Sequence, residues 1–435
     1  MKALMKAVVA RRRLAYLPRH AGGLHRLRRD VMASPITPTA APEALSGSPP
    51  VSAEGLRVAL YSGNYNSVRD GANKALNRLV GRLLERGAAV RVYSPVAPEP
   101  AFEPTGDLVA VPSVPIPMRN EYRISYGLSG PVRQDLIDFR PNLLHLAVPD
   151  YTAWRAQTLA RTLGIPIVAS LHTRFETYFE YYGLGFLRPL GERYLEMFYG
   201  RCDLVLTPNA ALGYNVCRAS GTRTSMWSRG VDGELFSPAN RDLEWRRANG
   251  YADNEVVVAF FGRLVLEKGT EIFGRIVTEL RRRGHRVVPL LIGDGPERER
   301  MAAALGEAVF TGHVEAAELA RAIACADVVI NPSVTEAFGN VNLEAMSAGL
   351  AVVGSDVPVT RAMIEPGVTG LVADPASATD FADAAESLIV DPELRARIGA
   401  AARREAARYD WDAILDGVIA DYRALVAGQE VGNAC

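Results

Sequence analysis

The sequence has few cysteines, no long apolar run and no excess of charge of either sign. Its four cysteines, Cys202, Cys217, Cys325 and Cys435, are scattered over 435 residues without the spacing of metal ligands. We interpret them as reduced thiols of a cytosolic protein. No apolar run reaches the roughly 18 residues that cross a bilayer. The formal net charge is zero, so nothing indicates the strong positive field of a nucleic-acid-binding protein.

What the sequence does contain is typical of a soluble globular protein. Hydrophobic residues make up 48% of the chain and charged residues 23%. A length of 435 residues suits two domains of ordinary size.

The zero net charge hides a basic N-terminal arm. Residues 1–30 hold nine Lys or Arg and a single acidic residue, Asp30. Residues 34–53 are rich in Pro, Ser, Ala and Thr, which predicts a flexible linker. We assign residues 1–54 to this arm and linker. Three interpretations stay open: an arm that touches anionic lipid, a disordered tail, or a wrongly chosen start codon.

After the linker, strand-like and helix-like segments alternate. Apolar runs at 56–62, 88–94, 143–146 and 165–171 predict strands, and helical patterns at 70–86, 130–139 and 151–163 lie between them. Such alternation predicts parallel sheets with helices on both faces. We assign residues 55–235 to a first, acceptor-side Rossmann-like domain.

The same pattern starts again near residue 250. Strands are predicted at 255–262, 287–292 and 328–330, and helices at 268–283 and 315–325. We therefore predict an α/β protein with a second Rossmann-like domain over residues 236–408, joined through the turn-rich stretch 229–240. Ligands of such sheets bind at the carboxyl ends of the strands, so we expect the site in a central cleft that the two domains face.

Two glutamates in the second domain are the most informative feature of the chain. Glu336 and Glu344 lie eight residues apart, after the strand-like run that ends at Asn331-Pro332, with Gly339 between them. The order strand, glycine-bearing loop, helix start supplies backbone N–H groups and the positive end of a helix dipole, which favour phosphate. Carboxylates accept hydrogen bonds from hydroxyl groups. The arrangement therefore suits a nucleotide-sugar, in which polyols flank a phosphate.

This segment resembles the Glu-x7-Glu signature of the retaining glycosyltransferases of family 4, which have the two-domain GT-B fold. The resemblance covers about residues 55–428 and implies that Glu336 approaches the donor sugar while Glu344 holds the ribose. Backbone groups of Phe338, Gly339, Asn340 and Val341 would assist at the phosphates. The alternative interpretation makes Glu336 a solvated loop residue and Glu344 a residue that merely favours the helix dipole.

Further loops of the second domain match the same family. Arg263 and Lys268 follow its first strand as a Gly-Arg…Lys-Gly pair, and they would stabilise the negative charge that develops on the departing diphosphate. The resemblance implies that the loop ending at Val314 meets the nucleobase through backbone groups. For the loop 293–296 we predict a structural role as a tight turn entering a helix at Pro296.

The first domain is expected to supply fewer site residues. Gly71, at the start of a predicted helix, is our choice for a close backbone approach to the donor phosphates. His172 follows a predicted strand, and the matching family position implies that it faces the reacting centre. The alternative for His172 is a structural histidine in the protein interior.

The C-terminal helix begins with Asp410-Trp411-Asp412, which spells the Asp-x-Asp triplet of metal-dependent transferases with the other main fold. At the start of a helix, however, Asp caps the backbone and favours the dipole, and we prefer this interpretation. The resemblance further implies that the segment 409–435 crosses back onto the first domain.

An aromatic stretch between residues 175 and 186 is unusual in a chain with 8% aromatic residues. It predicts either a packed helix face or an amphipathic lip for a lipid acceptor, which Arg174, Arg188 and Arg193 would hold against an anionic bilayer. Together with Ser228–Asp232, this region resembles the glycolipid-forming branch, which includes sulfoquinovosyl-diacylglycerol synthases and the α-mannosyl- and glucuronosyl-diacylglycerol transferases.

Taken with the resemblance, these features predict a metal-independent retaining glycosyltransferase. It would move a hexose or hexuronic acid from a UDP- or GDP-sugar to a membrane lipid such as diacylglycerol or ceramide, at the cytosolic face, and form an α-glycoside. No cofactor and no metal ligand are expected, and nucleic acid is not an expected partner. The alternatives are a polysaccharide or lipopolysaccharide transferase and, from other classes, a nucleotide-sugar epimerase or a non-catalytic nucleotide-sugar-binding protein.

Overall fold

The structure, a computed structural model, describes residues 51–68, 71–116, 119–171, 188–336 and 338–435. The basic arm, His172 and the aromatic stretch 175–186 lie outside these ranges.

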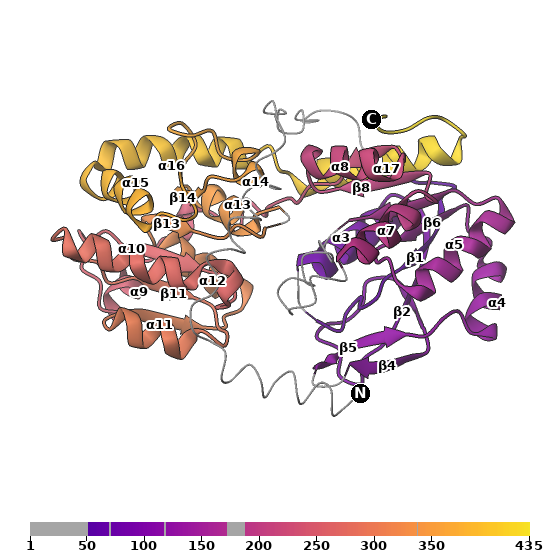
Figure 1. Cartoon of the computed structure of the whole chain (residues 1–435), viewed down its shortest axis with the longest axis horizontal. Coiled ribbons are helices and arrows are strands. Elements are labelled where there is room, and N and C mark those ends of the chain that lie inside the picture. The colour runs from indigo at the N-terminus through magenta and orange to yellow at the C-terminus, as the bar shows by residue number, and fades with distance from the viewer. Residues whose placement is uncertain (1–50, 69–70, 117–118, 172–187, 337) are drawn as a thin grey trace. The chain divides into compact units, whose positions relative to one another are not determined.

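Over the described residues, the first domain contains a parallel sheet of seven strands (Figure 1). In sheet order the strands are β3 (Asp107–Ala110), β2 (Ala89–Ser94), β1 (Arg57–Tyr61), β6 (Leu143–Leu146), β7 (Ile167–Ser170), β8 (Leu204–Thr207) and β9 (Thr224–Met226). Side chains alternate across each strand, so a sheet covered on both faces needs apolar residues at successive positions. In β1, Val58 and Leu60 belong to one core, whereas Ala59 and Tyr61 belong to the other.

Helices cover both faces of this sheet. They are α3 (Gly71–Glu85), α4 (Gly130–Phe139), α5 (Tyr151–Leu163), α7 (Arg188–Tyr199) and α8 (Ala210–Ser220). A short antiparallel hairpin, β4 (Ser113–Ile116) and β5 (Arg119–Ser125), stands apart from the sheet.

The second domain repeats the design with a parallel sheet that has six strands within the described part of the chain. In sheet order these are β12 (Val309–Gly312), β11 (Leu290–Ile292), β10 (Val258–Phe261), β13 (Val328–Asn331), β14 (Ala351–Ser355) and β15 (Leu371–Ala373). Its helices are α9 (Leu243–Ala248), α10 (Thr270–Arg282), α11 (Arg298–Leu305), α12 (Ala316–Ala324), α13 (Asn340–Ser347), α14 (Pro358–Arg361), α15 (Ala378–Val390) and α16 (Pro392–Ala406). The predicted fold class is therefore confirmed, while the domain bounds given above stay a prediction.

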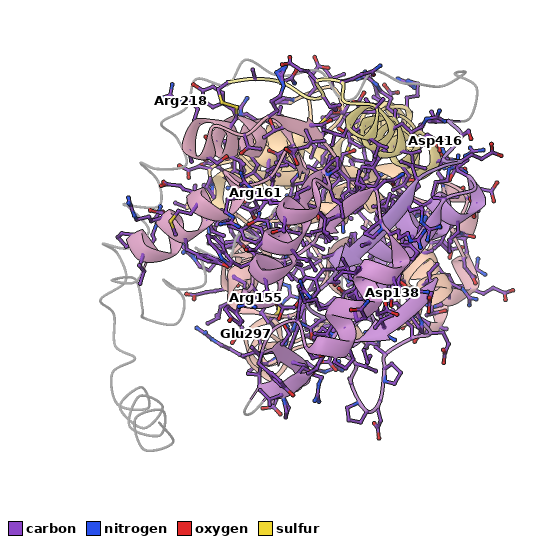
Figure 2. All side chains as sticks on the ribbon, turned by 90° about the vertical axis from the view of Figure 1, so that its right-hand side faces the viewer. Asp138, Arg155, Arg161, Arg218, Glu297 and Asp416 are labelled. Atoms are coloured by element: carbon purple, nitrogen blue, oxygen red, sulfur yellow. A yellow bond between two sulfur atoms is a disulfide. The ribbon has the colours of Figure 1, made fainter. Side chains whose placement is uncertain are left out.

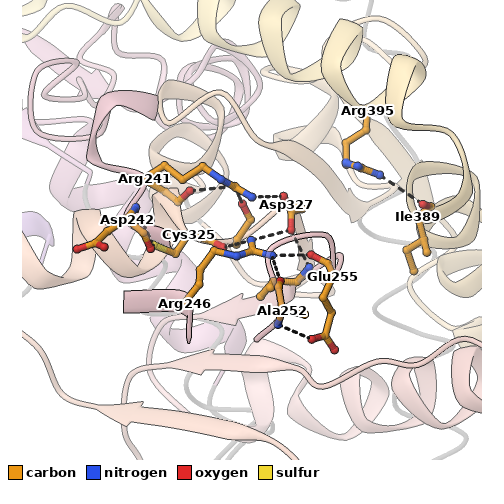
Figure 3. A network of polar contacts seen from close by, with 12 residues as sticks. Arg241, Asp242, Arg246, Ala252, Glu255, Cys325, Asp327, Ile389 and Arg395 are labelled. Atoms are coloured by element: carbon orange, nitrogen blue, oxygen red, sulfur yellow. Dashed lines mark hydrogen bonds and ion pairs between the residues drawn. The ribbon is translucent and has the colours of Figure 1, made fainter. Parts of the chain in front are cut away.

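One buried arginine ties α9 to the amino-terminal ends of two central strands (Figure 3). Arg246 is 0% exposed and donates to the carbonyl oxygens of Cys325 and Glu255, at 2.8 and 2.5 Å. It also forms an ion pair with Asp327, at 3.0 Å. The same carboxylate oxygen of Asp327 accepts a hydrogen bond from the backbone N–H of Val257. These contacts satisfy a charge that would be costly to bury unpaired.

The last helix, α17 (Trp411–Val426), packs on the first domain although it follows the second in sequence (Figure 1). Leu415, Val418 and Ile419 join the core that contains Val58 and Leu60. Asp416, labelled in Figure 2, accepts hydrogen bonds from Arg82 of α3 at 2.8 and 2.9 Å. The predicted return of the C-terminal helix is confirmed.

The prediction of four reduced thiols is wrong for two cysteines. Cys217 of α8 and Cys435 form a disulfide, with their Cα atoms 5.5 Å apart. Cys202 and Cys325 are free and buried. The two bonded cysteines are 218 residues apart in sequence, and only the return of the C-terminal segment onto the first domain brings them together.

Candidate active site

Lys268 and Glu336 meet at the carboxyl ends of two neighbouring strands. β10 and β13 are parallel partners, so the segments that follow Phe261 and Asn331 leave the sheet at the same edge. The first segment leads through a 3-10 turn, Leu266–Lys268, and the second contains Glu336. The Lys268 ammonium and the Glu336 carboxylate form an ion pair at 2.5 Å.

Two further contacts hold these segments against each other. Gly269 has φ +78°, and a Cβ there would lie 3.0 Å from the carbonyl oxygen of Pro332. The Thr335 hydroxyl donates to the carbonyl oxygen of Glu267, at 3.2 Å. A residue other than glycine at 269 would therefore be strained and would push the segments apart.

Helix α13 begins next to this ion pair. Gly339 precedes it with φ 98°, a conformation that favours glycine, and no side chain caps the first backbone N–H groups. Asn331 donates to the Asn342 side chain at 2.8 Å and so ties the helix to the end of β13. The buried Oδ1 of Asn340 has no hydrogen-bond partner in this structure. Free N–H groups and the dipole of α13 favour an anion here.

The packing of the side chains at this helix and at Val314 is compatible with the predicted contacts through backbone groups. The side chains of Val314, Phe338 and Val341 are partly buried and pack against the apolar core. The Phe338 ring meets that of Tyr409 edge-on, with the ring centroids 5.9 Å apart. Since these side chains pack inward, what Phe338 and Val341 can offer a ligand is chiefly their backbone groups.

Glu344 lies on α13 in an environment that disfavours its charge. Burial raises the pKa of its carboxyl from 4.5 to about 7, and the nearby Lys74 opposes part of that increase. Lys74 belongs to α3, whose first residue is Gly71. A Cβ added at Gly71 would lie 3.0 Å from the Asn340 side-chain nitrogen. The starts of α3 and α13 are therefore close together.

The structure brings most, but not all, of the predicted site residues into one region. Lys268, Glu336, Gly339, Asn340, Glu344 and Gly71 form it. Arg263 is exposed on the loop that leads from β10 to Lys268, and a Cβ at the preceding Gly262 would lie 3.7 Å from the Val341 side chain of α13, so this part of the loop lies at the same edge. His172 lies outside the described ranges, so its predicted role stays a prediction.

Several residues at this edge were missed by sequence reasoning. The hydroxyls of Thr270, Ser333 and Ser355 are buried and have no hydrogen-bond partner in the structure. Thr270 starts α10, Ser333 follows the end of β13 by two residues, and Ser355 is the last residue of β14, all at the ligand edge of the second sheet. That position was the available signal, because a polar residue directly after a buried strand faces the ligand edge.

The loop after β11 has the structural role that the sequence predicted. A Cβ at Gly293 would overlap the carbonyl oxygen of Gly262, and a Cβ at Gly295 would overlap that of Leu264. The two glycines thus allow this loop to lie directly on the loop that contains Arg263. Helix α11 begins at Arg298, two residues later than predicted.

Comparison with known proteins identifies the family. Residues 242–405 match the model described as "Glycosyl transferases group 1", and residues 69–235 match "Glycosyltransferase Family 4". A GDP-mannose-dependent alpha-mannosyltransferase of Mycolicibacterium smegmatis is 30% identical over 383 residues, which is 87% of this chain and all of that protein. This chain belongs to the group 1, family 4 glycosyltransferases.

Two further similarities agree with this assignment. This glycosyltransferase is 33% identical over 311 residues, 69% of its length, to Sulfoquinovosyl transferase SQD2 of Arabidopsis thaliana. That match spans 60% of the Arabidopsis protein. A sucrose-phosphate synthase structure from Thermosynechococcus elongatus superimposes with a TM-score of 0.68 over 86% of this chain and 99% of that one, at 20% identity. The last similarity concerns the fold alone.

In this glycosyltransferase the Asp-x-Asp triplet has structural partners. Asp410 caps α17 by accepting a hydrogen bond from the Ala413 N–H at 2.8 Å, and Asp412 pairs with Arg82 at 2.9 Å. The capping interpretation is confirmed. Over the ranges that the structure describes, no three His, Cys, Asp or Glu residues are grouped so as to hold a metal ion.

Proposed function

We propose that this glycosyltransferase moves a hexose or hexuronic acid from a UDP- or GDP-sugar to a membrane lipid, with retention and without a metal ion. The observation that supports it best is the meeting of Lys268, Glu336 and the uncapped start of α13 at one sheet edge. A nucleotide-sugar donor carries a diphosphate and two sets of hydroxyl groups, which match the cation, the N–H donors and the carboxylates of this site.

In the proposed mechanism the diphosphate leaves the sugar while the protein stabilises its charge. Arg263 and Lys268 supply positive charge, and the N–H groups from Phe338 to Asn342 donate hydrogen bonds. Glu336 orients the sugar and Glu344 accepts hydrogen bonds from the ribose hydroxyls. The departing phosphate takes the acceptor proton on the same face of the sugar, which gives an α-glycoside. His172 is the proposed partner on the reacting side.

Lysine 268 gives the direct test of this mechanism. Replacing Lys268 with Ala should lower kcat at least about a hundredfold, because removing one such charge stabiliser usually costs that much. The exposed neighbour Glu267, replaced with Gln, is the matched control and should keep most of the activity. Activity of Lys268→Ala near that of the unmodified enzyme would reject the phosphate role.

Metal independence is tested in the same assay. Turnover should survive a chelator and should not increase with magnesium or manganese. Loss of turnover with chelator, restored by either ion, would contradict the proposal. Conversion of the donor with no acceptor present would instead favour the epimerase alternative.

The lipid acceptor is supported by an exposed apolar patch on the first domain. Val114 and Ile124 are cross-strand partners in the β4–β5 hairpin and are 52% and 53% exposed. Tyr126 and Tyr151 are 63% and 57% exposed, and Tyr151 approaches Gly127. The hairpin is joined to the ligand edge of the first sheet, because Ser125 bonds to Tyr61 and Asp150. Tyrosine and aliphatic side chains together suit a membrane interface.

Helix α7 offers a second surface of the same kind. Leu190 and Met197 are 68% and 49% exposed and lie seven residues apart, so they share a face of the helix. Arg193, also exposed, lies between them. The predicted basic arm, with nine Lys or Arg in residues 1–30, supports an anionic lipid surface as well.

Vesicle flotation tests the lipid acceptor. The full chain should float with vesicles of phosphatidylcholine and phosphatidylglycerol, and the double variant Leu190→Ser/Met197→Ser should float less. Val390 on α15 is 62% exposed and apolar, so Val390→Ser is the matched control. If the full chain does not bind these vesicles, a soluble glycan acceptor becomes the better proposal.

The proposed location is the cytosolic face of a membrane. No helix in the described ranges is long and apolar enough to cross a bilayer. The Cys217–Cys435 disulfide counts against this location, because the cytosol keeps thiols reduced and disulfides are rare there. Counting free thiols by mass spectrometry in protein taken directly from cells tests the location: two free thiols in an intact chain mean that the disulfide is present in the cell.

A further inference from the structure

Lys268 and Glu336 form an ion pair and so neutralise each other. Their side chains are 30% and 13% exposed, so the carboxylate is the more deeply buried of the two. The contacts of Gly269 with Pro332 and of Thr335 with Glu267 fix the backbone on both sides of the pair. The backbone at this edge of the sheet therefore holds the two side chains next to each other.

This arrangement conflicts with both proposed roles at once. A phosphate oxygen and the Glu336 carboxylate compete for the same ammonium of Lys268. A carboxylate that keeps Lys268 as its partner has fewer lone pairs for sugar hydroxyls. Donor binding must therefore separate the pair, and the largely buried Glu336 carboxylate is destabilised if it is left without a partner.

We propose that the ion pair is exchanged when the donor binds, and that the exchange makes the site favour intact nucleotide-sugar over free nucleoside diphosphate. This inference rests on the proposed function. The diphosphate takes Lys268, and the sugar hydroxyls donate hydrogen bonds to Glu336 in its place. A nucleoside diphosphate separates the pair as well, but it offers Glu336 no replacement.

The exchange has a consequence for turnover. After transfer, the sugar is gone from the donor position, and Glu336 again competes with the product diphosphate for Lys268. Glu336 thus weakens product binding while it strengthens donor binding. It is a specificity-determining residue as well as a contact for the sugar.

Calorimetric titration of UDP, GDP and inorganic pyrophosphate tests the exchange. Glu336→Gln should bind these ligands about threefold to tenfold more tightly than the unmodified protein, because the competing charge is gone. Glu267→Gln removes the same charge one residue away from Lys268 without touching the pair, and it should change affinity less than twofold. A residue with only a structural role would weaken binding when replaced.

A double-variant cycle separates exchange from simple charge repulsion. In a Lys268→Ala background, Glu336→Gln should no longer tighten nucleotide binding, since the competition is for Lys268. Equal tightening in both backgrounds would overturn the inference. The inference is also overturned if Glu336→Gln binds the nucleotides no more tightly than the unmodified protein while the affinity of Glu267→Gln is unchanged.

Discrimination between donor and product gives a second readout. With UDP-glucose and GDP-mannose as probes, the affinity for nucleotide-sugar relative to nucleoside diphosphate should fall in Glu336→Gln by at least the factor gained by the diphosphate. Product inhibition should become stronger by a similar factor. A ratio that stays the same contradicts the exchange.

The failure of this inference can be told apart from the failure of the proposed function. If Lys268→Ala weakens nucleotide binding and abolishes activity while Glu336→Gln binds nucleotide unchanged, the exchange is wrong and the function stands. If the unmodified chain binds none of the three ligands, both are wrong. Glu336→Asp, which keeps the charge on a shorter side chain, provides an intermediate that should retain part of the discrimination.

Discussion

Glu344 shows how a single residue can report ligand binding through its charge. Its carboxyl has a pKa of about 7 in the folded chain, against 4.5 in an unfolded one, chiefly because it is buried. The sign of the effect on stability follows. Below pH 4.5 both states are protonated and there is no cost, whereas above pH 7 the folded state holds a disfavoured charge.

The first prediction concerns stability and pH at this residue. Replacing Glu344 with Gln should raise the free energy of unfolding by roughly 2–3 kcal/mol at pH 8 and change it little at pH 5. Urea unfolding at both pH values measures it. Glu299→Gln, an exposed acid on α11, is the control and should show no such difference. A Glu344→Gln effect of equal size at both pH values would show that the pKa is not raised.

A second prediction at the residue scale concerns nucleotide affinity. Ribose hydroxyls donate to the ionised carboxylate, so binding should favour that form and become tighter as the pH rises from 6 to 8. UDP and GDP titrate in this range themselves. The informative quantity is therefore the ratio of affinities between the unmodified chain and Glu344→Gln, which should increase with pH. A constant ratio would remove Glu344 from the ribose site.

At the scale of elements, Arg246 links the fold to the site. It holds α9 against Asp327, which directly precedes β13, and β13 ends at the loop that contains Glu336. Breaking a buried ion pair by removing one partner leaves the other charge buried and uncompensated. The stability of the second sheet therefore depends on this one side chain more than on the exposed charges around it.

The third prediction compares two neighbouring arginines on α9. Arg246→Met should destabilise the protein by about 3–5 kcal/mol. Arg247→Met is the control, since Arg247 pairs with Asp253 at 2.6 Å where both side chains are about half exposed, and it should leave stability nearly unchanged. Denaturation by urea measures both. Equal effects of the two replacements would mean that burial of Arg246 does not decide the cost.

How well the sequence predicted each element depended on local signals. Helices α4 and α5 have the predicted bounds because Ser129 and Asp150 cap their starts and Gly164 ends α5 in the left-handed conformation. Capping residues of these types can be recognised in the sequence. The β4–β5 hairpin was not predicted, since prolines at 115 and 117 argue against strands.

In the candidate site too, some features could be predicted from the sequence and others could not. The Glu336–Glu344 spacing and the Arg263–Lys268 pair were visible in the sequence, but the 2.5 Å contact between Lys268 and Glu336 was not. That contact joins residues 68 positions apart, and it depends on the pairing of β10 with β13. The raised pKa of Glu344 likewise depends on burial, which no spacing reveals.

At the scale of the whole molecule, the second domain is inserted in sequence between the first domain and a C-terminal segment that packs on the first domain. The chain leaves the first domain after β9, passes through the second and returns as α17. Val231 and Tyr409 mark the two crossings and are joined by a hydrogen bond of 2.9 Å. Beyond α17, Asn433 pairs with Thr224 of β9 through two hydrogen bonds, at 2.8 and 3.1 Å. The Cys217–Cys435 disulfide then closes a loop that contains every residue of the second sheet.

The last prediction follows from this closed loop. A cross-link over so long a loop should stabilise the protein by about 2–5 kcal/mol, because it restricts the unfolded chain. Cys435→Ser and reduction of the unmodified chain by dithiothreitol should lower the melting temperature by the same amount, and the two treatments together should do no more than either alone. Cys325→Ser, at a free buried cysteine, is the control for the loss of a thiol and should leave the sensitivity to dithiothreitol intact.

Measuring nucleotide affinity shows whether the Cys217–Cys435 disulfide only stabilises the fold or also affects the donor site. The residues of the proposed donor site, Lys268, Glu336 and Glu344, lie on the second domain and do not contact the disulfide. Cys435→Ser should therefore bind UDP or GDP as tightly as the unmodified chain at a temperature where both are folded. If nucleotide affinity falls together with stability, the C-terminal segment acts on the site, because α17 packs on α3 and α3 begins at Gly71 beside Asn340.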